Sequence, residues 1–249
     1  MQEKKISFSE WHQYFISNQD HFEDIDWENS DRLKYSEILL ITESIQQFQK
    51  GESSEGKNLL KFAKDFQNEE YLSAIKLFIR EEQKHALVLV KIMKANGIDK
   101  ITDHWVDSVF RILRKFSNLE NSIIFLSTAE IISAVYYKAL REATRSESLK
   151  TVCSQILSDE EMHINFQAYT LNYFHNQKNI VSKQIGRTLH KILMFGTAMV
   201  VWNYHKQVLK KGGYSFKQFI NAIFEEFDRF DEMILDKKKI VIRKVEFAV

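Results

Sequence analysis

The feature that most limits the fold of this 249-residue chain is its lack of proline, together with a total of only seven glycines. Proline breaks helix interiors, and each glycine weakens a helix by roughly 1 kcal/mol, so their scarcity favours long helices. Apolar residues also recur every three or four positions over long stretches, which is the periodicity of helices packed on a common core. The sequence therefore predicts an all-α protein.

The predicted helices form two hairpins with tight turns, joined by a long middle connection. This order is typical of a ferritin-like four-helix bundle with one long crossover and additional flanking helices. We expect a single domain over 1–249, with the bundle at about 31–175, additional helices at about 181–236 and a short extended arm at 239–249. The expected helices span about 7–17, 31–66, 69–95, 103–115, 118–145, 147–175, 181–211 and 214–236. Ser30 and Asp31 are candidate N-caps of the first long helix, which could kink at Gly51 or Gly56.

Charge and cysteine content narrow the class of protein. The net charge is +1, so neither nucleic acid nor an anionic membrane is the expected partner. Cys153 is the only cysteine, which rules out an internal disulfide and a cysteine-bound metal cluster. No apolar signal core follows Met1 and no run of 18 apolar residues occurs, so we expect a cytoplasmic protein without a membrane span.

Two predicted helices each contain the pattern Glu-x-x-His, as Glu82 with His85 and as Glu160 with His163. Residues three apart lie on the same face of a helix, and the apolar neighbours indicate that this face points inward. Burying charged groups is costly unless they are paired or bind a metal. One such motif occurs easily by chance, but two on separate inward faces require a joint explanation.

A repeated interval supplies that explanation. Glu82 follows Glu52 by 30 positions, and Glu160 follows Glu130 by the same interval. With a turn near each midpoint, about 15 residues run roughly 22 Å up one helix and the same distance down the next. Each early glutamate therefore lies level with a Glu-x-x-His motif. Four carboxylates and two imidazoles in one layer form the ligand set of a dinuclear carboxylate site, which favours two iron ions (Fe/Fe, with Mn/Fe as the alternative).

The first-helix ligand has a competitor. Glu52 and Glu55 both fall near the apolar stripe, and Glu52 is preferred because it lies at the height of Glu82. Glu55 would lie about one turn lower, as an extra ligand or a group behind the ligands. Glu81 and Glu161 point about 100° away from the ligands beside them, toward the surface or behind the site.

The ligand-bearing segments resemble the ferritin-like di-iron carboxylate superfamily. Gly51-Glu52-Ser53 is similar to the first metal helix of rubrerythrins, whereas the later half resembles cyanobacterial aldehyde-deformylating oxygenase. That likeness rests on Ala129-Glu130-Ile131-Ile132-Ser133-Ala134 and on Asp159-Glu160-Glu161-Met162-His163-Ile164-Asn165-Phe166. Outside its ligands, the first hairpin departs from the oxygenase. The resemblance implies that the metal ligands are Glu52, Glu82, His85, Glu130, Glu160 and His163.

Two further side chains are candidates for positions beside the metals. Tyr137 follows Glu130 closely and could hydrogen-bond near the site, although core packing is the more frequent role of such a tyrosine. His190, on a later helix, could tune the metals, although an ordinary core or surface histidine is more common.

Three functions are compatible with such a site. The first is an oxygenase or oxidase that uses dioxygen, an external electron donor and a small or apolar organic substrate, acting as a monomer or homodimer. The second is a ferroxidase or peroxide-scavenging protein of the ferritin or rubrerythrin type. The third is a helical scaffold without enzymatic activity, whose buried glutamates and histidines pair with one another.

Overall fold

The computed structural model describes residues 6–23, 25–28, 30–53, 56–101 and 118–243. In these parts of the chain it contains helices and no strands, which confirms the all-α prediction. The helices are α1 (Phe8–Ser17), α2 (Tyr35–Glu52), α3 (Lys57–Asp65), α4 (Glu69–Ala95), α6 (Leu119–Ala143), α7 (Glu147–His175), α8 (Ile180–Lys211), α9 (Phe216–Leu235) and the short 3-10 helix η1 (Lys237–Lys239). The helix expected at 103–115 lies outside the described residues.

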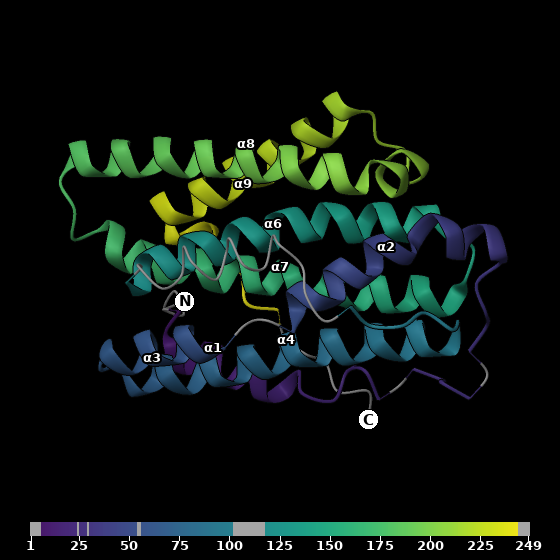
Figure 1. Cartoon of the computed structure of the whole chain (residues 1–249). Helices are drawn as coiled ribbons and strands as arrows, with labels where there is room; N and C mark the ends of the chain where they lie inside the picture. Colours follow the sequence, from purple (N-terminus) through teal and green to yellow (C-terminus); the bar gives the residue numbers. More distant parts are fainter. Residues whose placement is uncertain (1–5, 24, 29, 54–55, 102–117, 244–249) are drawn as a thin grey trace.

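The hairpin of α6 and α7 lies in the middle of the molecule (Figure 1). Helices α8 and α9 pack on one side of this hairpin, while α4 packs on the other and carries α1 and α3. Helix α2 packs against α4 and α8, and Phe48 of α2 stacks on Tyr136 of α6 with ring centroids 3.4 Å apart. The faces of α2, α4, α6 and α7 thus surround one interior, to which each contributes buried side chains.

A serine or asparagine side chain caps the N-terminus of most of the described helices. The side chains of Asn68 and Ser146 accept hydrogen bonds from the first turns of α4 and α7. These caps satisfy backbone N–H groups that have no partner within the helix. The turns between α3 and α4 and between α6 and α7 are short, so each pair lies antiparallel and the residues equidistant from a turn lie level.

The long helix expected at 31–66 is wrong in two respects. It is broken between α2 and α3, where Gly56 has a φ of +135°, a conformation that favours glycine. It also starts later, at Tyr35, because Lys34 is its N-cap residue and donates its backbone N–H to Glu37 Oε2. The Asp31 carboxylate instead accepts hydrogen bonds from the backbone N–H groups of Glu147 and Ser148 at the start of α7.

An extended arm is expected at 239–249, of which only residues 239–243 are described. Lys239 ends η1, Ile240 has an extended backbone (φ −79°, ψ 131°), and the chain continues without regular structure to Arg243. The backbone N–H of Val241 donates to Asn165 of α7, and the Arg243 guanidinium pairs with Glu161 of the same helix. Side chains of α7, rather than a neighbouring strand, therefore satisfy this segment.

Helix α6 is long and apolar enough to cross a membrane when judged by length and composition alone, with a mean hydropathy of 1.4. Within that window 72% of the helix is buried inside the protein. The central helix of a bundle has this character, because neighbouring helices cover most of its surface.

Candidate metal centre

The six side chains singled out by the repeat come together in the interior of the helices that the structure describes. Glu52 lies at the end of α2, and Glu130 lies in the middle of α6. The two Glu-x-x-His motifs occupy inward faces of α4 and α7. All six are buried, with exposed fractions from 0% to 8%: Glu52, Glu82, His85, Glu130, Glu160 and His163.

The donor atoms form two overlapping groups that could each hold a metal ion. One group contains Glu52, Glu82, His85 and Glu160, and the other contains Glu82, Glu130, Glu160 and His163. Within each group the ligand atoms lie within 4.8 Å of one another. Glu82 and Glu160 belong to both groups. Two shared carboxylates, with one further glutamate and one histidine on each side, suit a pair of adjacent ions.

Several atoms of the cluster have no hydrogen-bond partner among the described residues. They are Glu82 Oε1, His85 Nδ1, Glu130 Oε1, both carboxylate oxygens of Glu160, and His163 Nδ1. His163 Nδ1 lies 2.9 Å from Glu82 Oε1, but outside hydrogen-bonding geometry. Buried polar atoms are normally paired, and leaving them unpaired is costly. Two divalent cations would bind these atoms and neutralise four carboxylates, so the residues fit a dinuclear site.

The crowding of acidic groups changes their protonation when no cation is bound. Burial and the nearby Glu82 carboxylate raise the pKa of Glu52 well above its usual value, and burial and Glu130 do the same for the pKa of Glu160. Burial alone would lower the pKa of His163, but the surrounding carboxylates outweigh it and raise that pKa. The metal-free cluster therefore holds protons that cations would displace.

A second pair of carboxylates holds the two histidine rings from behind. His85 Nε2 lies 3.0 Å from Asp159 Oδ2, and His163 Nε2 lies 2.8 Å from Glu81 Oε2. The pairing is crosswise, since Asp159 of α7 supports the histidine of α4 and Glu81 of α4 supports the histidine of α7. A carboxylate on Nε2 leaves Nδ1 facing the glutamates and fixes the ring for metal binding.

The two carboxylates behind the histidine rings, Glu81 and Asp159, form an outer layer of the centre that the sequence predicts only in part. Glu81 is buried behind the ligands, as one of its two expected positions, whereas Glu161 is half-exposed and pairs with Arg243. The sequence-based predictions assign no supporting role to Asp159. The sequence does contain a sign of this role, because an acidic residue, Glu81 or Asp159, directly precedes each Glu-x-x-His motif.

The turn after α1 closes the outer layer. Asn18 Nδ2 donates to Glu81 Oε1 at 2.5 Å and to Asp159 Oδ1 at 3.1 Å, so one amide links both supporting carboxylates. His21 Nε2 lies 2.8 Å from Asp159 Oδ2. His21, Glu81 and Asp159 could by themselves hold a cation. Because both carboxylates already engage the histidine rings, we interpret this third group as support for the centre.

The amide link predicts a measurable loss of stability. Replacing Asn18 by alanine leaves two buried carboxylates without their common donor, and hydrogen bonds to charged groups contribute about 1.5–3 kcal/mol. We expect the free energy of unfolding of Asn18→Ala to fall by that amount in urea titrations. Asn221→Ala, at an exposed position of α9, is the control and should change little. Equal stability of the two variants would contradict the role given to Asn18.

The structure also places two of the remaining candidates. The Tyr137 hydroxyl donates to Glu52 Oε1 at 2.6 Å, which puts it directly behind a candidate ligand. His190 Nε2 lies 3.0 Å from Thr128 Oγ1, and its ring packs against Phe227 with centroids 4.9 Å apart. These neighbours are not candidate ligands. Burial lowers the pKa of His190 to about 4, so the ring is neutral at neutral pH. Glu55 lies outside the described residues.

Comparisons with protein-family models, with curated proteins and with solved structures found no match to this chain. The resemblance to di-iron proteins therefore rests on the motifs alone. Over its described residues, the protein is all-helical and contains a buried cluster of carboxylates and histidines that could hold metal ions.

Proposed function

We propose that this protein is a ferritin-like dinuclear iron protein that activates dioxygen and oxidises a small or apolar organic substrate. The observation that carries the proposal is the sharing of Glu82 and Glu160 between two groups of potential ligands. A structural salt-bridge cluster would balance its charges within the protein. Here only two imidazoles face four buried carboxylates, and although His163 Nδ1 lies 2.9 Å from Glu82 Oε1, the ligand-facing atoms form no hydrogen bond among the described residues. An iron pair supplies the redox chemistry for dioxygen when bound, and an Mn/Fe pair would fit the same donors.

Each side chain of the cluster has a distinct task in this proposal. Glu82 and Glu160 would contribute to holding both ions, and His85 and His163 would each offer one nitrogen to one of them. Glu52 and Glu130 complete the two ends. The Tyr137 hydroxyl orients the Glu52 carboxylate through its 2.6 Å hydrogen bond and holds a proton at Glu52 Oε1.

Aromatic rings separate the centre from water on the side of the histidines. Phe78 lies edge-on to His163 with ring centroids 4.6 Å apart, and Phe22 lies 5.8 Å from the ring of His85. Both phenylalanines are buried. A dry wall strengthens the electrostatic interactions of the carboxylates and protects a reactive centre from unproductive reactions with solvent. These rings favour an apolar substrate over a highly charged one.

Gln167 is the polar group that we assign to the substrate. It lies one turn after His163 on the same face of α7 and is fully buried. Neither its amide nitrogen nor its amide oxygen has a hydrogen-bond partner among the described residues. Such a group costs stability unless something binds it, so it is a candidate for orienting a polar end of an otherwise apolar molecule.

This assignment predicts a stabilising substitution. Gln167→Met removes an unpaired buried amide while keeping a similar shape, so the free energy of unfolding should rise by about 1–3 kcal/mol. Urea unfolding of the metal-free protein measures this change without reference to activity. Gln207→Met, at an exposed position of α8, should change little. Destabilisation by Gln167→Met would show that the amide already has a protein partner.

The proposed reaction is tested by loading the protein with ferrous iron under anaerobic conditions and then mixing it with oxygen. We expect oxygen consumption and an absorbance transient whose decay accelerates with a matching class of fatty aldehyde, acyl chain or amine. Oxidation of ferrous iron in repeated turnovers, with no acceleration by any substrate class, would instead identify a ferroxidase. Absence of any oxygen-dependent change in a protein that has bound two irons would contradict oxygen activation.

A further inference from the structure

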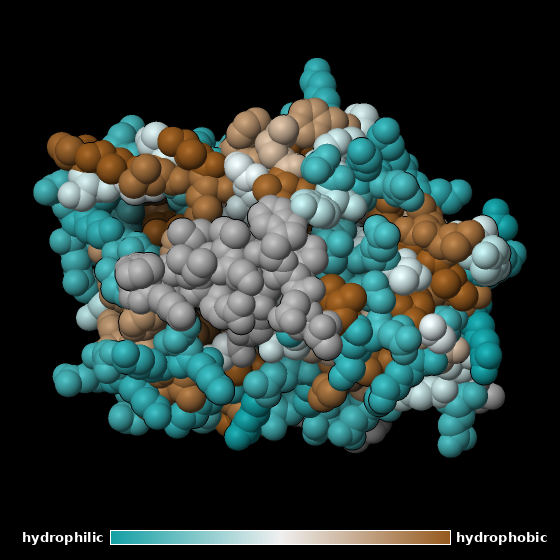
Figure 2. All heavy atoms as spheres, viewed as in Figure 1, coloured by the Kyte–Doolittle hydropathy of each residue, from teal (hydrophilic) through white to brown (hydrophobic). Residues whose placement is uncertain are grey.

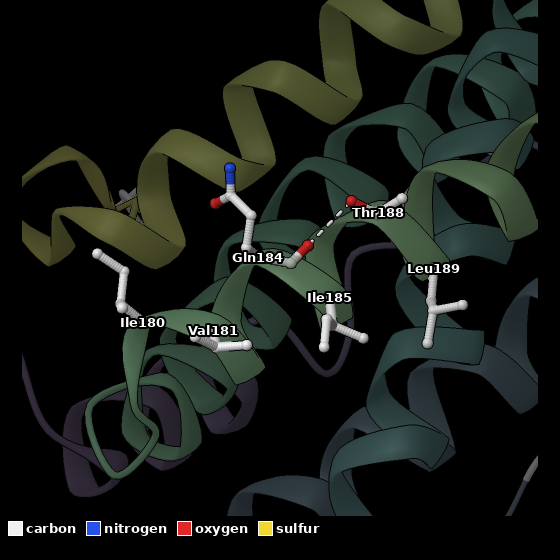
Figure 3. Close-up of a pocket in the computed structure, with 6 residues that line it drawn as sticks. All are labelled: Ile180, Val181, Gln184, Ile185, Thr188 and Leu189. Carbon is white, nitrogen blue, oxygen red and sulfur yellow. Dashed lines mark hydrogen bonds between the residues drawn. The ribbon is translucent and has the colours of Figure 1, made fainter.

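The first two thirds of α8 present large apolar side chains to the outside of the molecule. Figure 2 shows apolar surface at the upper left, where Figure 1 places the N-terminal part of α8. We call this set the α8 stripe; its members are 42–80% exposed and comprise Ile180, Val181, Ile185, Leu189, Ile192, Phe195 and Met199. Figure 3 shows the first of them along an open hollow, with Ile185 and Leu189 projecting from the same helix.

The cations of this part of α8 point away from the stripe. Arg187 Nε lies 2.8 Å from Asp231 Oδ2, and Lys191 Nζ lies 3.4 Å from Asp228 Oδ1, so α9 holds both side chains. Lys183 lies about 200° around the helix from Ile185. The face that carries Ile185, Leu189 and Ile192 therefore has no charged side chain of α8. Ile180 lies at the edge of this face, in line with Arg187.

The spacing of the stripe is that of a helix–helix seam. Ile185, Leu189, Ile192 and Met199 follow one another at intervals of four, three and seven residues. Gly196 completes this heptad pattern, and the space that a side chain would occupy at Gly196 is open. Heptad spacing keeps a seam facing a partner helix, and an open position accepts a side chain from that partner.

The size of the stripe matches one side of a stable interface. Its members are 42–80% exposed, so together they present a surface of the same order as the roughly 800 Å² that each partner contributes to a standard interface. The largest patch on a typical monomer is smaller, at roughly 300–600 Å². Leaving this surface in water is unfavourable, so something should cover it.

We propose that the α8 stripe is covered by the α8 stripe of a second copy of this chain, related by a two-fold axis with the helices antiparallel. An uncharged stripe can face itself without like-charge repulsion. Parallel pairing would place Lys206, Lys210 and Lys211 beside their counterparts, whereas antiparallel pairing separates these clusters. With the axis near Ile192, Leu189 of each copy faces Gly196 of the other.

A lipid surface is the main rival occupant. Helices that lie on anionic membranes combine an apolar face with free cations beside it. Here Arg187 and Lys191 are engaged by carboxylates of α9, Lys183 lies on the opposite side of α8 from Ile185, and Lys206, Lys210 and Lys211 lie beyond the stripe. Self-association therefore accounts better for the charge distribution than a membrane surface does.

Sedimentation of the full chain tests the pairing. The wild-type protein should be a dimer at micromolar concentration, and Ile192→Glu should be a monomer with unchanged helicity and metal content. The control is Leu39→Glu on α2, where the leucine is 65% exposed but lies outside the stripe, and this variant should stay dimeric. A monomeric wild-type protein, a dimeric Ile192→Glu variant, or a monomer that co-sediments with phosphatidylserine vesicles would overturn the proposal.

Disulfide trapping tests the antiparallel arrangement. Cys153 is fully buried, so the wild-type chain should not cross-link under mild oxidation. Ile192→Cys should form a covalent dimer, because the two copies of this residue meet near the axis. Ile185→Cys should not, whereas the double variant Ile185→Cys, Met199→Cys should. Efficient cross-linking of Ile185→Cys alone would show parallel pairing and overturn the arrangement. The metal centre takes no part in either experiment.

Discussion

Replacing Glu160 by glutamine is expected to reduce the metal content from two ions per chain to near zero. Glu160 belongs to both groups of potential ligands, and both of its oxygens lack hydrogen-bond partners among the described residues. An amide keeps the size of the side chain but removes a negative charge that both cations need. The adjacent Glu161 offers a matched control, because it is half-exposed and pairs with Arg243. Glu161→Gln should retain two ions.

Substitutions at the ends of the cluster should have a smaller effect than those at its centre. Glu52 and Glu130 each belong to one group only. Glu52→Gln and Glu130→Gln should therefore each lower the affinity for one ion, while the other ion stays bound. Anaerobic titration with ferrous iron, followed by metal analysis after desalting, measures both stoichiometries. If Glu160→Gln and Glu161→Gln bound the same amount of iron, the shared-carboxylate assignment would be wrong.

Metal binding should stabilise the fold by several kcal/mol, and by more at pH 8 than at pH 5. The folded-state pKa values of Glu52, Glu160 and His163 are raised above the usual 4.5 for glutamate and 6.5 for histidine. These groups favour the metal-free fold below those usual values, and their contribution is lost as the pH rises through the raised pKa values. Cations require the deprotonated forms, so metal affinity changes in the opposite direction.

The stability of the loaded protein minus that of the metal-free protein depends on metal affinity, so this difference should grow as the pH rises and protons leave the cluster. Asp159 and Glu82 do not alter this window, because their pKa values are lowered and their contribution is lost only as the pH falls below about 4. At a free metal concentration 1,000 times the dissociation constant, the stabilisation is about 4 kcal/mol. Urea unfolding at pH 5 and pH 8, with ferrous iron and with a chelator, measures the difference. A metal-dependent stabilisation that shrank from pH 5 to pH 8 would contradict the account.

Much of the metal centre could be predicted because its ligands recur at regular intervals in the sequence. Two equal intervals, from Glu52 to Glu82 and from Glu130 to Glu160, place four carboxylates at one height whenever tight turns lie between them. The break at Gly56 does not change this prediction, because α2 still ends with Glu52 buried inside the bundle. Helix periodicity likewise located the described helices to within a few residues, apart from the first long one.

The rest depended on contacts that have no local signature. Asn18 and His21 lie in a turn between helices, and only the packing of α1 on α4 brings them to Glu81 and Asp159. Asp31 precedes an apolar-periodic segment and so resembles its cap, yet it satisfies the start of α7, more than 100 residues away. Which helix a polar side chain serves follows from the tertiary arrangement, not from its position in the sequence.

The most direct test of the central claim is anomalous X-ray scattering from crystals of the iron-loaded protein, measured at the iron absorption edge. We expect two adjacent peaks of similar height, one for each ion. Both ions should contact Glu82 and Glu160, with one near His85 and the other near His163. A crystal without peaks at this position would contradict the account, as would a single peak held by His21, Glu81 and Asp159.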